Sequence, residues 1–116
     1  PGTITGQWQS SIETDSVTYD LQFELDTPEN QELSGGRLVG NGELAAATDS
    51  WAFQIPSGTF RRPVLGLTLR FEMTFDGRRL PVTINGTVDE QFQEISADIS
   101  GGPPQFEERP ITITRP

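Results

Sequence analysis

The side chains that most enzymes use for nucleophilic or proton-transfer chemistry are scarce in this chain. It has no His and no Cys, and all eight basic residues are Arg, so Lys is missing as well. Hydrolysis by a Ser-His-Asp arrangement needs an imidazole base, and Schiff-base chemistry needs an amine side chain. Zinc and copper sites depend on imidazole or thiolate ligands. The sequence therefore excludes the common nucleophilic mechanisms, and we expect no transition-metal site and no cofactor.

Carboxylates are the chemistry that remains, and one pair has the spacing of a catalytic pair. Glu24 and Asp26 are two residues apart on one face of an expected strand. This places them about 6.6 Å apart, a separation found between paired glycosidase carboxylates. Both project from the face expected to lie in water, where nothing desolvates either group enough to hold its proton near neutral pH. We interpret the pair as solvated surface and expect no catalytic residues.

Calcium is a metal ion that oxygen ligands alone can bind. The segment from Asp26 to Glu32 gathers carboxylate and amide oxygens, but it lacks the Asp-x-Asp-x-Asp-Gly spacing of a dedicated calcium loop. We interpret it as an acidic loop without a metal ion.

Two Arg doublets are the main basic features of the chain. Arg61-Arg62 precedes an expected strand over 65–75 and Arg78-Arg79 follows it, so the two doublets lie near opposite ends of that strand. Exposed ion pairs with the surplus carboxylates are worth about 0–1 kcal/mol each, whereas Arg is enriched at protein interfaces. The residues that we expect to contact a protein partner are the doublets and a Phe in a Pro-rich loop: Arg61, Arg62, Arg78, Arg79 and Phe106.

The overall charge excludes other classes of partner. The formal net charge is -9, from 17 acidic and 8 basic residues, and such a field repels nucleic-acid phosphates and anionic lipid headgroups. No stretch approaches the roughly 18–20 consecutive apolar residues that cross a bilayer. We expect no nucleic-acid partner and no membrane span.

Alternation with a period of two residues dominates the elements that position these side chains. It is clearest over 17–26 and 65–75, where apolar residues take one face and polar residues the other. This pattern is typical of an antiparallel sheet with one wet face. The dipeptide Asp76-Gly77 then predicts a tight hairpin. Further strands are expected over 3–12, 36–47, 51–60, 80–88, 95–99 and 111–114.

Turn-forming residues interrupt this alternation at three places. Pro56-Ser57-Gly58 changes its parity, which predicts a bulge or a bend. Asn41-Gly42 is an alternative hairpin turn inside the strand over 36–47. The segment 101–110 is rich in Gly and Pro and is expected to be a loop.

The strand pattern predicts one all-β domain over 1–116. Leu, Ile, Val and Phe make up 29 of the 116 residues, which is above the roughly 20% below which chains tend to remain disordered. Eight strands joined mostly by tight turns give an antiparallel up-and-down order, and closing the sheet removes its exposed edges. We therefore predict an eight-stranded antiparallel up-and-down barrel, with a two-sheet β-sandwich as the alternative.

Aromatic residues fall on the inward positions of these strands. They could line a cavity for a small apolar ligand or fill the interior. Because several inward positions are Gly, the rings are needed to reach native packing density, and we expect them to fill the barrel. The residues that would contact a ligand in the alternative case are Trp8, Tyr19, Phe23, Trp51, Phe53 and Phe71.

The first expected strand carries Gly6-Gln7-Trp8, and Arg115 follows the last one. These residues resemble the Gly-x-Trp motif and the terminal Arg of the calycin superfamily, the lipocalins and avidins. In that family the Trp plugs one end of the barrel and the Arg stacks over it, a favourable contact between a guanidinium and an indole face. The resemblance implies a barrel in which Trp8 pairs with Arg115, or else with Arg109. It implies no ligand.

The leading hypothesis for function is a non-enzymatic module that binds another protein or forms a structural accessory subunit of a larger assembly. The only Met is Met73 and the chain given starts at Pro1, as it would after removal of a targeting segment or after trimming of a longer chain. On the first of these explanations we expect an extracytoplasmic protein, periplasmic or secreted. The alternative is a carrier of a small apolar ligand in the barrel interior. A weaker alternative is a hydrolase that uses Glu24 and Asp26.

Overall fold

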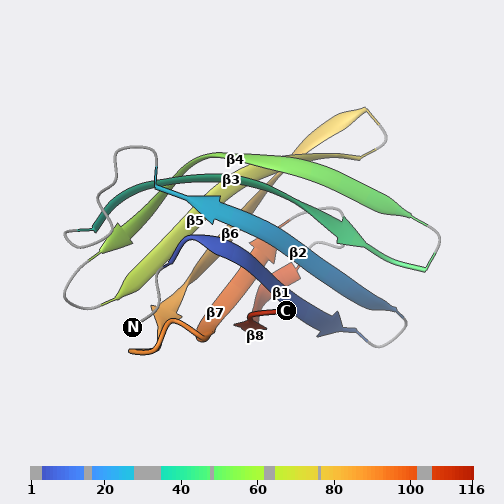
Figure 1. Ribbon diagram of the computed structural model, residues 1–116. Helices are drawn as coiled ribbons and strands as arrows, with labels where there is room; N and C mark the ends of the chain where they lie inside the picture. The colour runs from blue at the N-terminus through green and yellow to red at the C-terminus, as the bar shows by residue number, and fades with distance from the viewer. Residues whose placement is uncertain are drawn as a thin grey trace.

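The computed structural model describes most of the chain as strands joined by turns (Figure 1). The described residues are 4–14, 17–27, 35–47, 49–61, 65–75, 77–101 and 106–116. None of them belongs to a helix that is long and apolar enough to cross a membrane. The strands are β1 (Gly6–Glu13), β2 (Thr18–Asp26), β3 (Gly35–Ala45), β4 (Ser50–Arg61), β5 (Gly66–Phe75), β6 (Arg78–Val88), β7 (Glu94–Gly101) and β8 (Phe106–Thr114).

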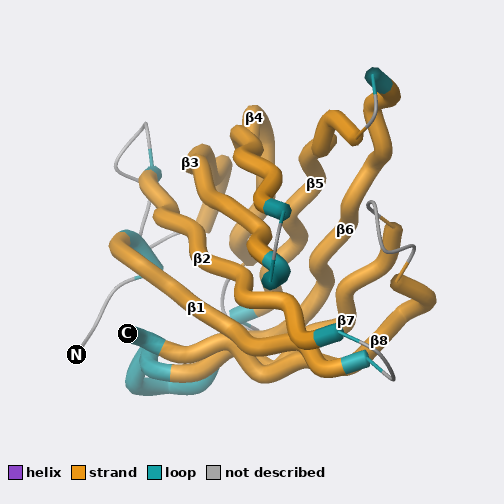
Figure 2. Tube along the Cα trace, turned by 90° about the vertical axis from the view of Figure 1, so that its right-hand side faces the viewer, coloured by secondary structure: helices purple, strands orange, loops and turns teal. Residues whose placement is uncertain are grey.

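These strands form a closed antiparallel barrel. Each strand pairs with the next along the chain, and β8 returns to β1. Figure 2 shows β1, β7 and β8 together on one side of this barrel, while the hairpin of β5 and β6 reaches out beyond its neighbours. The predicted eight-stranded up-and-down barrel is confirmed, and the two-sheet sandwich is not the arrangement seen.

Alternation along each strand divides the wall into an inner and an outer face. In β2, Leu21, Phe23 and Leu25 are buried, whereas the polar residues between them are exposed. Burial of a large apolar side chain contributes about 1.5–3 kcal/mol. The inward residues of all eight strands join into one apolar core, which holds the barrel together.

The bend predicted in the fourth strand is confirmed. Phe53 and Ile55 face inward, but the next inward ring is Phe60, so the parity of the side chains changes between them. The pairing of β4 with β5 shifts between Gln54 and Ser57. A bulge of this kind bends a strand and increases its local twist.

The hairpin after the fifth strand is also confirmed. Phe75 pairs with Arg78, so that residues 76 and 77 lie between the two strands. Gly77 has φ of +79°, a conformation that glycine adopts without steric cost.

The alternative turn at Asn41-Gly42 is wrong. Both residues lie within β3, where Asn41 pairs with Gln54 and Gly42 with Phe53. The glycine is there to let the chain pack closely, because a Cβ atom at Gly42 would lie 2.7 Å from Phe53 Cζ.

The loop expected over 101–110 is wrong in its second half. The last strand spans Phe106–Thr114 and contains Pro110, which pairs with Asp98 of β7. On the side facing β1, the described part of β8 has a ladder pair only at Thr114. A proline without an N–H donor is tolerated in such an edge-like strand, so tertiary pairing extends the strand through a residue that usually indicates a loop.

Candidate binding surfaces

The interior of the barrel is occupied by rings that pack against one another. Phe53 and Phe71 stack with ring centroids 4.1 Å apart and planes 15° apart. Phe60 and Phe92 meet edge to face at 6.1 Å. All four rings are at most 5% exposed, and such pairs add about 0.5–1.5 kcal/mol beyond the burial of their area. These contacts favour a filled interior.

Gly42 provides the space for this packing. A row across the wall joins Trp8, Phe23, Gly42 and Phe53, one residue from each of the first four strands. A Cβ atom at Gly42 would lie 2.6 Å from Phe23 Cβ and 2.7 Å from Phe53 Cζ. The Gln22 carbonyl oxygen lies closer still, at 2.3 Å, so the volume that a side chain would take at this position is filled by backbone and by the neighbouring aromatic side chains.

The aromatic residues predicted to face inward lie in two environments. Four are buried in the core: Trp8, Phe23, Phe53 and Phe71. Tyr19 and Trp51 are half-buried near the starts of β2 and β4, with ring centroids 6.4 Å apart and planes tilted by 37°. These two rings lie against the edge of the core at the end of the barrel that the β1–β2 and β3–β4 connections form.

Trp8 and Arg115 close the opposite end of the barrel. The guanidinium carbon of Arg115 lies 3.8 Å from the centroid of the Trp8 ring, and Trp8 Nε1 donates a hydrogen bond to the Ile4 carbonyl at 3.0 Å. Arg115 also donates to the carbonyls of Thr5 at 2.9 Å and Phe92 at 3.1 Å. The predicted pairing of Trp8 with Arg115 is therefore confirmed, and the guanidinium ties three chain segments together.

Side chains complete the seam between β1 and β8, where ladder pairing within the described residues is confined to one position. Ser10 Oγ donates to the Thr112 carbonyl at 2.8 Å. Arg109 Nη1 donates to the Glu13 carbonyl at 2.9 Å. Arg109 thus braces this seam and is not the partner of Trp8. A hollow of about 280 Å³ remains on the outer side of the seam.

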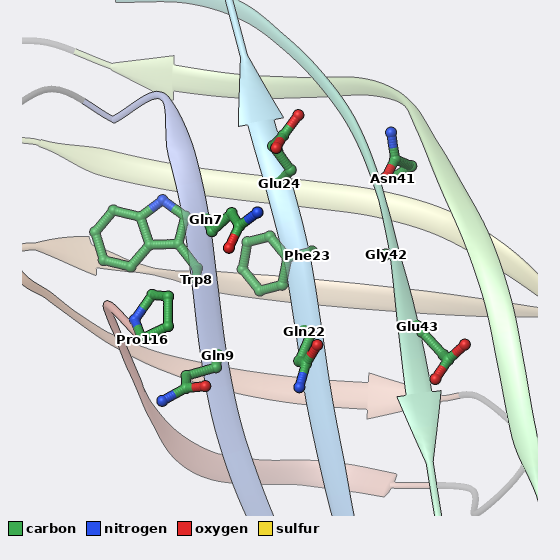
Figure 3. Close-up of a pocket in the computed structure, with 10 residues that line it drawn as sticks. All are labelled: Gln7, Trp8, Gln9, Gln22, Phe23, Glu24, Asn41, Gly42, Glu43 and Pro116. Atoms are coloured by element: carbon green, nitrogen blue, oxygen red, sulfur yellow. The ribbon is translucent and has the colours of Figure 1, made fainter.

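A polar hollow of about 440 Å³ lies on the outer wall over β1, β2 and β3 (Figure 3). Apart from Pro116, its exposed side chains are amides and carboxylates: Gln7, Gln9, Gln22, Glu24, Asn41 and Glu43. Trp8 and Phe23 also border it, but their side chains are buried. This hollow therefore presents mainly hydrogen-bonding groups, and neither of its aromatic residues is exposed for a ligand to stack on.

Glu24 and Asp26 stand on this outer wall in contact with water. Both are exposed, as the sequence predicts. One Asp26 oxygen accepts a hydrogen bond from the Thr27 amide at 2.8 Å. Of the acidic segment from Asp26 to Glu32, positions 28–32 lie outside the described residues.

The hydrogen-bond ladder between β4 and β5 stops partway along these strands. Its last pair is Gln54 with Glu72. Beyond it, Ser50–Phe53 pair only with β3 and Met73–Phe75 only with β6 in the part of the chain that the structure describes. We call the gap between these two segments the β4–β5 split. Figure 1 shows the end of β5 turning away from the start of β4.

A hollow of about 980 Å³ follows the β4–β5 split along the outer wall. The stacked rings of Phe53 and Phe71 form its floor, and the exposed side chains of Arg70, Glu72 and Arg79 stand on its β5 and β6 side. Neither Arg makes a side-chain hydrogen bond or ion pair with another described residue.

Arg37 supports the bulge in β4, which lies next to the last ladder pair before the split. Its Nη2 donates a hydrogen bond to the Pro56 carbonyl at 2.9 Å. Pro56 lies where the pairing of β4 with β5 is interrupted, and it has no N–H to offer to a ladder. The contact from β3 thus stabilises the bend at which the split begins.

The residues predicted to bind a partner do not form one patch. Arg61 ends β4 beside the start of β5, whereas Arg78 begins β6 beside the end of β5, so these two residues lie at opposite ends of β5 as predicted. Of these residues, Arg79 lines the hollow at the split. Arg62 lies outside the described residues, and so does the side chain of Phe106, whose backbone begins β8.

Sequence reasoning missed Phe92 as a core residue because it lies in a polar turn. Phe92 has φ of +57° and is 4% exposed. One Asp89 carboxylate oxygen accepts hydrogen bonds from the amides of Gln93 at 2.7 Å and Glu94 at 3.0 Å. This turn directs the ring inward, and the signal that could have found it is a lone Phe between polar residues.

Comparison of the chain with models of protein families, with curated proteins and with solved structures gave no significant match. Function is therefore inferred from the geometry of the barrel alone.

Proposed function

We propose that this barrel is a non-enzymatic protein-binding module, and that it recognises its partner on the outer wall at the β4–β5 split. The observation that carries this proposal is the interrupted ladder between β4 and β5, which ends at Gln54 and Glu72 beside a hollow of about 980 Å³. An open sheet edge on an otherwise closed barrel is a natural place for another chain to bind.

The packing of the interior supports a partner on the outside. The rings of Phe53 and Phe71 are in contact with each other, and Gly42 has no room for even a Cβ atom. A carrier of an apolar ligand needs an internal cavity of several hundred cubic ångströms. Core rings in contact with one another favour recognition on the surface over recognition in the interior.

The side chains around the split are of the kinds that protein interfaces use. Arg70 and Arg79 supply two guanidinium groups, and Ala52, Pro56 and Pro81 supply apolar surface. Arg is enriched at interfaces because its planar guanidinium donates several hydrogen bonds and pairs with carboxylates. The exposed position of Glu24 and Asp26 in water also fits a role that involves no catalysis.

We also propose a distant relationship to the calycin superfamily. The support is the stacking of Arg115 on Trp8 at the start of the first strand of an eight-stranded barrel. This relationship concerns the architecture and the end plug only, because the interior is filled where a lipocalin-like carrier would hold its ligand.

Site-specific photo-crosslinking tests the proposed function. A photoreactive residue replaces Ala52 at the split, and a matched one replaces Ser96 on β7, which is also exposed. In extracts of the source organism, we expect the probe at position 52 to capture a distinct protein and the probe at position 96 to capture none. A protein that stays monomeric and gives no crosslink at position 52 contradicts the proposal.

A further inference from the structure

We infer that the barrel opens along the seam between β1 and β8, and that Arg109 and Arg115 act as two clasps that control this opening. In the strand order the seam lies half the barrel away from the β4–β5 split. The inference concerns a movement built into the fold and does not depend on the proposed function.

The ladder between β1 and β8 is the shortest in the described part of the barrel. It consists of one pair, Gln9 with Thr114. By contrast, β1 pairs with β2 over its whole length, and β8 pairs with β7 from Thr114 to Arg109 without a break. The seam can therefore open while both of its strands keep their other neighbour.

The backbone of β8 directs alternate residues toward β1. Ser10 Oγ of β1 donates a hydrogen bond to the Thr112 carbonyl at 2.8 Å, so the backbone groups of Thr112 point to the seam. Groups two residues apart on a strand point to the same side. The backbone nitrogen of Pro110 therefore also points to the seam, where it has no hydrogen to donate.

The register of the seam places a proline opposite β1 near each end of this strand. Continued in both directions from its ladder pair, the register puts Pro110 opposite Glu13 and Pro116 opposite Gln7. Pro116 also lines the outer hollow that Gln7 borders (Figure 3). In this register the carbonyls of Glu13 and Gln7 face a residue without an N–H.

A guanidinium supplies the missing donor at both places. Arg109 Nη1 donates to the Glu13 carbonyl at 2.9 Å. Arg115 Nη1 donates to the Thr5 carbonyl at 2.9 Å and, at 3.5 Å, to the Gln7 carbonyl. Each of these two Arg residues directly precedes the proline whose donor it replaces. We call the two side chains the clasps of the seam.

A seam held by clasps opens more readily than one held by a ladder. Local opening needs less free energy than global unfolding where few backbone hydrogen bonds must break. Each clasp is released when one side chain rotates, whereas a ladder separates only when the strand moves as a whole. The seam is thus the line along which the closed barrel is expected to open first.

Amide hydrogen exchange of the full chain, read by NMR, tests this opening. The amides of Gln9 and Thr114, which we call the seam amides, point across the seam. The amides of Ser10 and Ile12 point from β1 to β2 and are called the β2-facing amides. Relative to their intrinsic rates, the seam amides should exchange at least about tenfold faster than the β2-facing amides.

Removal of a clasp should speed this exchange, because the seam then opens more often. Arg109→Ala should raise the exchange rate of the seam amides by about threefold to tenfold, the effect of losing one hydrogen bond. The β2-facing amides should stay within about twofold of the wild type. The matched control is Arg79→Ala, an exposed Arg of β6, which should change neither group.

Restoring a backbone donor should have the opposite effect. Pro110→Thr gives β8 an N–H opposite Glu13, and it should slow exchange of the seam amides by at least about threefold. Arg109→Ala should then have a smaller effect in the Pro110→Thr background. Pro81→Thr adds an N–H on β6, away from the seam, and should leave the seam amides unchanged. Pro110→Thr also carries the test if Arg109→Ala does not fold.

Three results would overturn the inference. Equal protection of the seam amides and the β2-facing amides would show that β1 and β8 separate only on global unfolding. If Arg109→Ala speeds exchange equally at the seam and at the pair Leu69 and Ile84 of β5 and β6, Arg109 stabilises the whole barrel and is not a clasp. Seam exchange that is unchanged or faster in Pro110→Thr would mean that the missing donor does not weaken the seam.

Discussion

The rings of Phe53 and Phe71 stack with centroids 4.1 Å apart at the point where the ladder between β4 and β5 ends. Past this contact the two strands part, and on its inner side the core is continuous. One ring pair thus marks both features on which the proposed function depends: the contact between core rings and the end of the β4–β5 ladder.

Gly42 is expected to be intolerant of a side chain because its Cβ atom would lie 2.3 Å from the Gln22 carbonyl oxygen, 2.6 Å from Phe23 Cβ and 2.7 Å from Phe53 Cζ. Gly42→Ala should lower the free energy of unfolding by about 2 kcal/mol, as overpacking of a core does. A Phe53→Leu background should relieve only the part of this cost that comes from the ring, because the Gln22 carbonyl oxygen stays in place. Urea denaturation of the wild type, the two single variants and the double variant measures the coupling between positions 42 and 53. Equal costs of Gly42→Ala in both backgrounds would show that Gly42 does not make room for the Phe53 ring.

Arg115 is expected to contribute more to the free energy of unfolding than an exposed surface residue does. Arg115→Ala removes the contact with Trp8 and the bonds to the carbonyls of Thr5 and Phe92, so we expect a loss of about 2–3 kcal/mol. Arg115→Lys keeps the charge but not the planar set of donors, and its loss should be intermediate. The exposed Arg79→Ala is the control and should stay within about 0.5 kcal/mol of the wild type. An equal effect of the Arg115 and Arg79 substitutions in denaturant titration would argue against the end plug.

Arg37 is expected to stabilise the bulge in β4. Arg37→Ala removes the hydrogen bond to the Pro56 carbonyl and should cost about 0.5–1 kcal/mol, the value for one partly solvated bond. Amide exchange should rise in β4 around the bulge, whereas Arg70→Ala, an exposed Arg of the neighbouring strand, should leave it unchanged. If amide exchange in β4 is the same in both variants as in the wild type, the bulge is stable without this contact.

The contacts between the core rings lead us to expect that the protein does not carry small apolar ligands. Native mass spectrometry should find the bare chain, and a fluorescent fatty-acid analogue should show no saturable uptake, because packed rings leave no dry cavity for it. Stoichiometric uptake that is displaced by unlabelled fatty acid would instead support the carrier hypothesis.

Much of the fold is encoded locally and was therefore predictable. The alternation in β2, the turn after Phe75 and the parity change near Pro56 each depend on a few adjacent residues. The pairing of Trp8 with Arg115 was predictable from a family resemblance, although the two residues are far apart in the chain.

The remaining features depend on pairing between distant segments. Pro110 is read as a loop residue until β7 is seen to pair with it. The split depends on where the ladder between β4 and β5 ends, which alternation alone does not reveal. The roles of Arg37 and Arg70 follow from that register, so the sequence offered no sign of either.

Amide hydrogen exchange in the free protein tests the central claim most directly. The pair Phe60 and Leu67 lies within the ladder between β4 and β5, whereas Ser50–Phe53 lie beyond its end. We predict that amides of Ser50–Phe53 that point toward β5 exchange at least roughly a hundredfold faster than the amides of Phe60 and Leu67. Equal protection of the two segments would mean that the ladder continues to the end of the strands, and it would contradict the existence of an open edge for a partner.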